Sequence, residues 1–208
     1  MLETISGFLM KLLGPVSGDA IKKILVRIRR PKVQLSRAPA NILEHIAPGA
    51  PADRVRELLG SPHKAVSSVW SYRFEDLLLT IEFWKGGSVR TVLAGVAKIH
   101  KRARFKIYPL EFELGTLVLS DVVADGFNVR LRTTNKTEEL LVQKNYGMPG
   151  NHWYFTFGAL WAPYIYQSDF KWDYQKNKLN SDPSEVLMNW VAISESSDEV
   201  WFDYSMFC

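Results

Sequence analysis

Three strand-like runs joined by short turns constrain the fold of this chain more than any other feature of its sequence. The runs are Val69–Phe74, Leu77–Trp84 and Val89–Val96, and they are rich in β-branched and aromatic residues. Only the Glu75-Asp76 dipeptide separates the first two runs, and the Gly86-Gly87 pair before the third run is typical of a hairpin turn. The sequence therefore predicts a three-stranded antiparallel meander.

Two short helices are expected before this meander. Asn41–Ala47 is suited to one short helix, and Asp53–Leu59 has apolar residues at helical spacing. Gly60 and Pro62 follow as helix-ending residues. We expect six side chains of this helix-helix-three-strand unit to be largely buried: Val55, Leu58, Trp70, Tyr72, Ile81 and Phe83.

The same segment carries a motif shared with a known family. The motif reads Pro48-Gly49, Val55-Arg-Glu-Leu-Leu-Gly-Ser-Pro62, Trp70-Ser-Tyr72, Leu79-Thr-Ile-Glu-Phe83 and Val89. Over residues 44–97 the chain resembles the SmpA/OmlA small lipoproteins and the wider β-lactamase-inhibitor-protein-like superfamily. The resemblance implies a helix that ends sharply and lies across a sheet, with aromatic side chains between them. Those lipoproteins carry a signal peptide and a lipidated cysteine, which we do not find here, so the resemblance implies the fold alone.

The second half of the chain resembles a degenerate second copy of this unit within residues 112–208. Leu114–Val122 corresponds to the turn and helix, and Tyr146–Phe157 corresponds to the Gly-x-Pro element and the aromatic strand. The polar segment 171–185 is expected to be a loop. Further strands are predicted in five places: Asn128–Thr133, Glu139–Asn145, Trp153–Phe157, Leu187–Ser194 and Val200–Phe207.

Composition divides the chain into four segments within an α+β fold. We expect a basic amphipathic helical segment at 1–31, a linker at 32–43, the α+β unit at 44–106 and a β-rich, acidic, aromatic-rich unit at 107–208. The first 106 residues hold 19 Lys and Arg against 8 Asp and Glu, whereas the remainder holds 7 against 14. The halves therefore carry opposite charge, which favours two faces with different partners.

Two roles are suited to the basic N-terminal segment. Its apolar residues recur at helical spacing, so residues 1–30 suit either an anionic membrane surface or docking on the protein's own body or another chain. We find no apolar stretch of the ~18 residues that span a bilayer and no signal peptide, and Cys208 is the only cysteine. A cytoplasmic protein is expected, with the inner membrane face as an alternative location. The basic residues of this segment are Lys22, Lys23, Arg27, Arg29 and Arg30.

Nucleic-acid binding is a further alternative, because two basic tracts occur at 22–32 and 98–106. In the second tract the cations are Lys101, Arg102 and Arg104, with lysines at either end. Phe105 lies beside them and is suited to base stacking. The tracts match no recognised nucleic-acid module, so a solvated basic surface is the simpler interpretation.

Catalytic motifs are absent from the sequence. The four histidines have no zinc-ligand spacing, and there is neither a nucleophile elbow nor a phosphate-binding glycine loop. The adjacent carboxylates Glu138 and Glu139 lie on a predicted strand, where neighbours point to opposite faces and do not converge. We therefore expect no enzyme activity, no metal and no cofactor.

An aromatic cluster is the most unusual feature of the second half. Alternation predicts that about half of it is buried, and exposed Trp and Tyr are favoured anchors of protein interfaces. We therefore expect a non-catalytic binding protein of the inhibitor, immunity or assembly type, whose partner is another protein or a second copy of this chain. The residues expected to bind are Tyr146, His152, Trp153, Tyr154, Trp161, Tyr164 and Tyr166.

Overall fold

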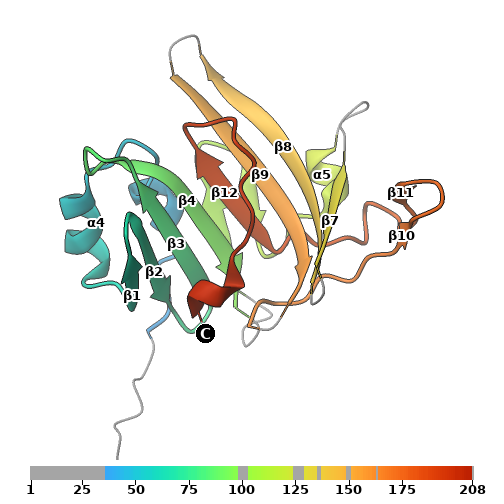
Figure 1. The fold of residues 1–208 in the computed structure, drawn as a ribbon, viewed down its shortest axis with the longest axis horizontal. Helices are drawn as coiled ribbons and strands as arrows, with labels where there is room; N and C mark the ends of the chain where they lie inside the picture. Colours follow the sequence, from blue (N-terminus) through green and yellow to red (C-terminus); the bar gives the residue numbers. More distant parts are fainter. Residues whose placement is uncertain are drawn as a thin grey trace, which may run out of the picture. The chain divides into compact units, whose positions relative to one another are not determined.

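The computed structural model describes residues 36–97, 103–123, 129–134, 137–148, 151–162 and 164–207. These residues belong to one compact unit, which runs from Leu35 to Cys208. The N-terminal helices predicted for residues 1–31 lie outside the described ranges. The described part is sheet-rich, and its largest element is an eight-stranded antiparallel sheet (Figure 1). The strand order is β1 (Lys64–Val66), β2 (Val69–Arg73), β3 (Leu77–Phe83), β4 (Val89–Val96), β12 (Trp190–Ser194), β9 (Asn151–Trp161), β8 (Glu138–Met148) and β7 (Arg130–Thr133).

The predicted meander is present as β2, β3 and β4, and the helices before it are α3 (Ile42–His45) and α4 (Ala52–Leu59). The short edge strand β1 was not predicted. Among the side chains expected in the core, Val55, Tyr72, Ile81 and Phe83 are buried and Trp70 is half-buried. The expectation for Leu58 is wrong, because 38% of this residue is exposed. Val55 is the only fully buried residue of α4, so the helix meets the core along a narrow stripe.

The two predicted sequence units contribute to one continuous sheet. β12 comes from the end of the chain and pairs with β4 on one side and β9 on the other. At this seam, Trp190 lies opposite Gly95 of β4 and Gly158 of β9. The segments 44–106 and 107–208 are thereby joined by backbone hydrogen bonds across the middle of the sheet.

Both faces of the sheet bury apolar side chains. In β3, Leu77 and Leu79 belong to a large core on one face, while Leu78 belongs to a smaller core on the other. The larger core is completed by α3, α4, α5 (Leu119–Val122), β5 (Phe105–Ile107) and β6 (Phe112–Leu114). The smaller core is completed by residues near the C-terminus, including Phe202 and Phe207. Successive side chains of a strand therefore contribute in turn to two separate hydrophobic cores, one on each face of the sheet.

Residues 195–207, which we name the C-terminal segment, cross the face that carries the smaller core (Figure 1). The strand predicted at Val200–Phe207 is wrong, because this part has no strand and ends in the 3-10 helix η1 (Tyr204–Phe207). Two of its aromatic residues are buried in the smaller core: the ring of Phe202 lies 6.1 Å from that of Trp190 and stacks on Phe207 at 5.9 Å. In a strand these two side chains, five residues apart, would point to opposite faces, whereas the irregular segment and its 3-10 helix let both enter the same core.

The polar segment 171–185 was expected to be a loop, and it contains a small hairpin. The hairpin is formed by β10 (Trp172–Asp173) and β11 (Lys178–Leu179). Its turn is held by the Asp173 carboxylate, which accepts the backbone N–H groups of Gln175 and Lys176 at 3.0 Å.

Two glycines in the sheet make room for the aromatic side chains of the smaller core. A Cβ atom on Gly158 would lie 2.0 Å from Cε2 of Trp190, and a Cβ atom on Gly95 would lie 2.6 Å from the Phe202 ring. Real Cβ atoms do not approach other atoms this closely, so glycine is required at both positions. The indole of Trp190 can therefore lie flat across β9.

Candidate functional site

The predicted binding residues form two separate groups. The β8–β9 hairpin extends beyond its neighbours at the top of Figure 1, since β12 pairs with β9 only between Tyr154 and Gly158. Near this projecting end, Tyr146 lies opposite Trp153 on the neighbouring strand. Tyr146 is 51% exposed, Trp153 and Tyr154 are half-buried, and His152 is exposed.

The second group lies at the other end of β9. Trp161 is eight residues from Trp153, which corresponds to roughly 26 Å along a strand. Trp161 is 48% exposed, and the exposed ring of Tyr164 is 5.5 Å from the Arg73 guanidinium carbon. Tyr166 is half-buried and packs against the larger core. One interface of ordinary size centred on the hairpin end would not include this second group.

Most of the predicted basic surface lies outside the described ranges. This applies to the cations of residues 22–30 and to Lys101 and Arg102. Arg104 is described, and its exposed guanidinium lies 3.8 Å from the Glu113 carboxylate. The membrane-surface and nucleic-acid alternatives therefore stay predictions. Within the described residues, no helix is both long enough and apolar enough to cross a membrane.

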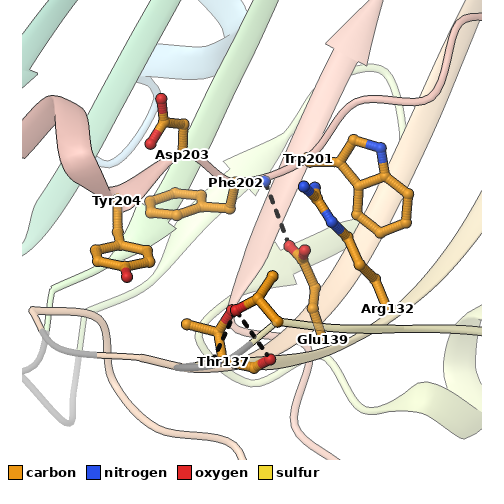
Figure 2. A pocket seen from close by; sticks show the side chains of 8 residues that line it. Arg132, Thr137, Glu139, Trp201, Phe202, Asp203 and Tyr204 are labelled. Carbon is orange, nitrogen blue, oxygen red and sulfur yellow. Dashed lines mark hydrogen bonds between the residues drawn. The ribbon is translucent and has the colours of Figure 1, made fainter.

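A polar pocket that was not predicted lies between the C-terminal segment and the β7–β8 edge of the sheet. Its volume is about 190 Å³. Figure 2 shows that its side chains come from β7, β8 and the overlying C-terminal segment, with Asp203 pointing away from Glu139 and Arg132. We name it the Glu139 pocket; its lining residues are Arg132, Thr134, Thr137, Glu139, Trp201, Phe202, Asp203 and Tyr204.

The floor of the pocket is a buried carboxylate. Glu139 is 4% exposed, lies opposite Arg132 of β7, and accepts the backbone N–H of Phe202 at 3.3 Å. Its neighbour Glu138 is exposed and accepts the hydroxyl of Tyr174 at 2.6 Å. The prediction that these adjacent carboxylates do not converge is confirmed.

Burial determines the protonation of Glu139. Removal from water raises the pKa of Glu139 from 4.5 to about 7, because an ionised carboxylate is poorly solvated there. The Phe202 N–H, the charge of Arg132 and the indole of Trp190 act in the opposite direction and only partly compensate. The indole N–H of Trp190 is itself buried without a hydrogen bond of normal geometry, so its effect on the carboxylate is the weakest of the three. Glu139 is therefore poised to exchange a proton near neutral pH.

The side of the pocket is a cation–π pair. The guanidinium carbon of Arg132 lies 4.4 Å from the ring centroid of Trp201, as the close approach of the two side chains in Figure 2 shows. No ion pair forms between Arg132 and Glu139, both of which are described residues. The pocket therefore combines a cation and an anion that are close enough to interact electrostatically but are not in contact.

Salt bridges fix the C-terminal segment above this face. Arg90 of β4 contacts Asp198 at 2.5 Å and Glu82 at 3.2 Å, and Arg130 of β7 pairs with Glu199. A second cavity of about 340 Å³ lies on the other side of Trp201 and is lined largely by these ion-paired residues. The strand arginines thus anchor the segment that closes the Glu139 pocket.

No signal in the sequence pointed to the pocket. In β8, Glu139 shares a strand face with Leu141 but also with Gln143 and Asn145, so alternation does not set its carboxylate apart from ordinary polar residues. The sequence did not reveal that Trp201 to Tyr204 would cover this position. Among the described residues, no group of three or more His, Cys, Asp or Glu could hold a metal ion.

Comparison with known proteins does not extend this description. No family model, no curated protein and no solved structure matches the chain.

Proposed function

We propose that this is a non-catalytic protein-binding protein that contacts its partner through the projecting end of the β8–β9 hairpin. The observation that carries the proposal is the cross-strand pair of Tyr146 and Trp153, in which a half-exposed tyrosine stands beside a half-buried tryptophan. Aromatic residues of this kind are enriched where interfaces gain most of their binding energy. An assembly, immunity or inhibitor role fits such a surface.

The tyrosine is held in place before any partner arrives. Its ring meets the buried Phe155 ring edge to face, with centroids 6.1 Å apart and planes at 89°. A ring that is already ordered loses little conformational entropy on binding. The hairpin therefore presents a rigid aromatic anchor rather than a mobile side chain.

We further propose that residues 44–97 are a unit of the SmpA/OmlA type. The element order of two helices followed by a meander supports this. Gly60 ends α4 with a φ of 72°, and the Tyr72 hydroxyl donates to its carbonyl at 3.3 Å, tying the helix end to β2. The tandem inhibitor proteins of that superfamily pair two such units and bind a partner protein, and the proposed function is of the same kind.

We expect Tyr146→Ala to weaken binding of the native partner by about 2 kcal/mol, or about 30-fold, with little change in melting temperature. The partner would be recovered from the native host on the tagged full-length protein, identified by mass spectrometry and then purified. Its affinity for each variant would be measured by calorimetry.

Trp161→Ala is the matched control, because it removes an aromatic of similar exposure from the opposite end of β9. We expect this variant to bind the partner as tightly as the wild-type protein. Equal affinity for both variants would show that the hairpin end is not the interface. A larger loss for Trp161→Ala would move the interface to the second aromatic group.

A further inference from the structure

The Glu139 pocket has features of a ligand site that the proposed binding of a protein does not use. Its volume of about 190 Å³ is many times what one ordered water requires. Its floor is a carboxylate that is 4% exposed and accepts one backbone hydrogen bond, from Phe202. Burying a carboxylate costs free energy unless a cation or several donors compensate it.

We propose that the Glu139 pocket binds a small organic cation through a primary ammonium group, with Glu139 as its counter-ion. The inference is independent of the hairpin surface. It assigns a second class of partner, a small amine, to the opposite end of strand β8.

The chemistry of the lining favours a cation over an anion. One buried carboxylate, that of Glu139, and one guanidinium, that of Arg132, face the pocket, whereas the exposed Asp203 carboxylate points away from both in Figure 2. The hydroxyls of Thr134 and Thr137 add acceptor oxygens, which lie 2.7 Å apart. Because Arg132 is held against Trp201 at the side, an ionised Glu139 leaves the floor of the pocket with acceptor oxygens, which suit a cation.

Arg132 does not take the place of the ligand. Its guanidinium lies over the Trp201 ring, and among the described ion pairs none joins it to the Glu139 carboxylate. In Figure 2 the carboxylate of Glu139 lies between the Arg132 side chain and the ring of Phe202. An ammonium ion is compact and carries three donors, so it can enter where a planar guanidinium held on a ring cannot.

The aromatic walls suit the rest of such a ligand. Trp201, Phe202 and Tyr204 all line the pocket. Their rings offer apolar surface to a short alkyl chain, and their faces attract positive charge. A small alkylammonium ion matches both the apolar walls and the acidic floor, whereas a free metal ion would use only the floor.

Proton release distinguishes an amine from an anion. The charged and titratable groups around Glu139 are Arg132 from β7 and Asp203 and Tyr204 from the C-terminal segment, with the Trp190 indole from β12. An ammonium ligand favours the ionised form of Glu139, so its binding releases a proton near pH 7 and becomes about tenfold tighter between pH 6 and pH 8. An anionic ligand on Arg132 would cause proton uptake instead.

The test is calorimetric titration of the full-length protein with ethylammonium chloride in amine-free buffers at pH 6 and pH 8. We expect saturable binding, proton release and tighter binding at pH 8. Glu139→Gln should weaken binding at pH 8 at least tenfold while the protein remains folded by thermal melting. Glu138→Gln, on the opposite face, should bind like the wild-type protein.

Several results would overturn the proposal. The first is no saturable binding up to ~100 mM ethylammonium, about 100 times the millimolar dissociation constant that is the tight limit for a ligand of three non-hydrogen atoms. The others are equal binding by folded Glu139→Gln and saturable binding of sodium acetate with proton uptake. A pocket that holds only water would give the first result. If the hairpin variants lose their protein partner while ethylammonium binding is unchanged, the two sites are independent, as proposed.

Discussion

Gly158→Ala is expected to destabilise the fold by about 3 kcal/mol, the upper end for overpacking a core. The added methyl group would lie 2.0 to 2.4 Å from three atoms of the Trp190 indole. The indole cannot retreat easily, because Trp190 is fully buried and its ring packs against Phe202 at 6.1 Å. Either the ring or the β9–β12 pairing must shift, and both changes disturb the seam that joins the two halves of the sheet.

Urea unfolding would measure this effect, with Gly86→Ala as the matched control. Gly86 lies in the β3–β4 turn, and an added Cβ atom there would meet no heavy atom within 4 Å. We expect this control to differ from the wild-type protein by less than about 0.5 kcal/mol. If Gly158→Ala were equally mild, the flat seating of Trp190 would be wrong. The double variant Gly158→Ala/Trp190→Leu should lose less stability than the sum of the single variants, because leucine removes the clash.

Local signals in the sequence predicted the local structure of the first half well. Gly60 and Pro62 specified the end of α4, and the alternating runs around Gly86 specified β3 and β4. Each of these signals lies within a few residues of the structure that it determines. The sheet-rich α+β character and the antiparallel meander of β2, β3 and β4 were therefore predictable.

The position of β12 was not predictable by the same means. Its register places Trp190 beside Gly95, which is 95 residues earlier in the chain. Nothing in a short window identifies this partner, although glycine at both Gly95 and Gly158 is the complement of a large side chain between them. The apolar pattern of residues 200–207 was equally ambiguous, because its buried aromatic side chains enter one core from an irregular segment rather than from a strand.

The candidate sites were predictable only in part. The density of aromatic residues indicated the segment that forms the β8–β9 hairpin, but the sequence did not separate the exposed Tyr146 from the half-buried Trp153, Tyr154 and Tyr166. The Glu139 pocket depends on long-range contact between β8 and the C-terminal segment. A buried charge of this kind is recognised only when its cover is known.

The stability of the protein should depend on pH through Glu139. Its pKa is about 7 in the folded state and 4.5 when unperturbed, so between these values the folded protein binds a proton that the unfolded chain has released. The contribution of Glu139 is therefore fully favourable below pH 4.5 and is lost as pH rises through 7. A shift of this size corresponds to about 3 kcal/mol between pH 4.5 and pH 8.

Glu139→Gln should remove this dependence, because the amide is nearly the same shape and cannot ionise. At pH 8 we expect the variant to be more stable than the wild-type protein by about 2 to 3 kcal/mol, and at pH 4.5 the two should be similar. Urea unfolding at both pH values would measure the difference in unfolding free energy between the variant and the wild-type protein. The titration of all other groups is common to both proteins and cancels in this difference. Glu138→Gln is the control, and we expect it to follow the wild-type protein at both pH values.

If Glu139→Gln is more stable than the wild-type protein at pH 8 and also loses amine binding, Glu139 serves a ligand. The same variant would behave differently if the carboxylate served only the structure. A carboxylate retained for structure alone would lose stability on replacement, because the Phe202 N–H would lose a charged acceptor. A carboxylate retained for a ligand costs stability while its pocket is empty, and the bound ammonium offsets that cost. If Glu139→Gln is less stable than the wild-type protein at pH 8, burial is not the dominant influence on this group. The charged hydrogen bond to the C-terminal segment would then explain why a glutamate lies beneath Phe202.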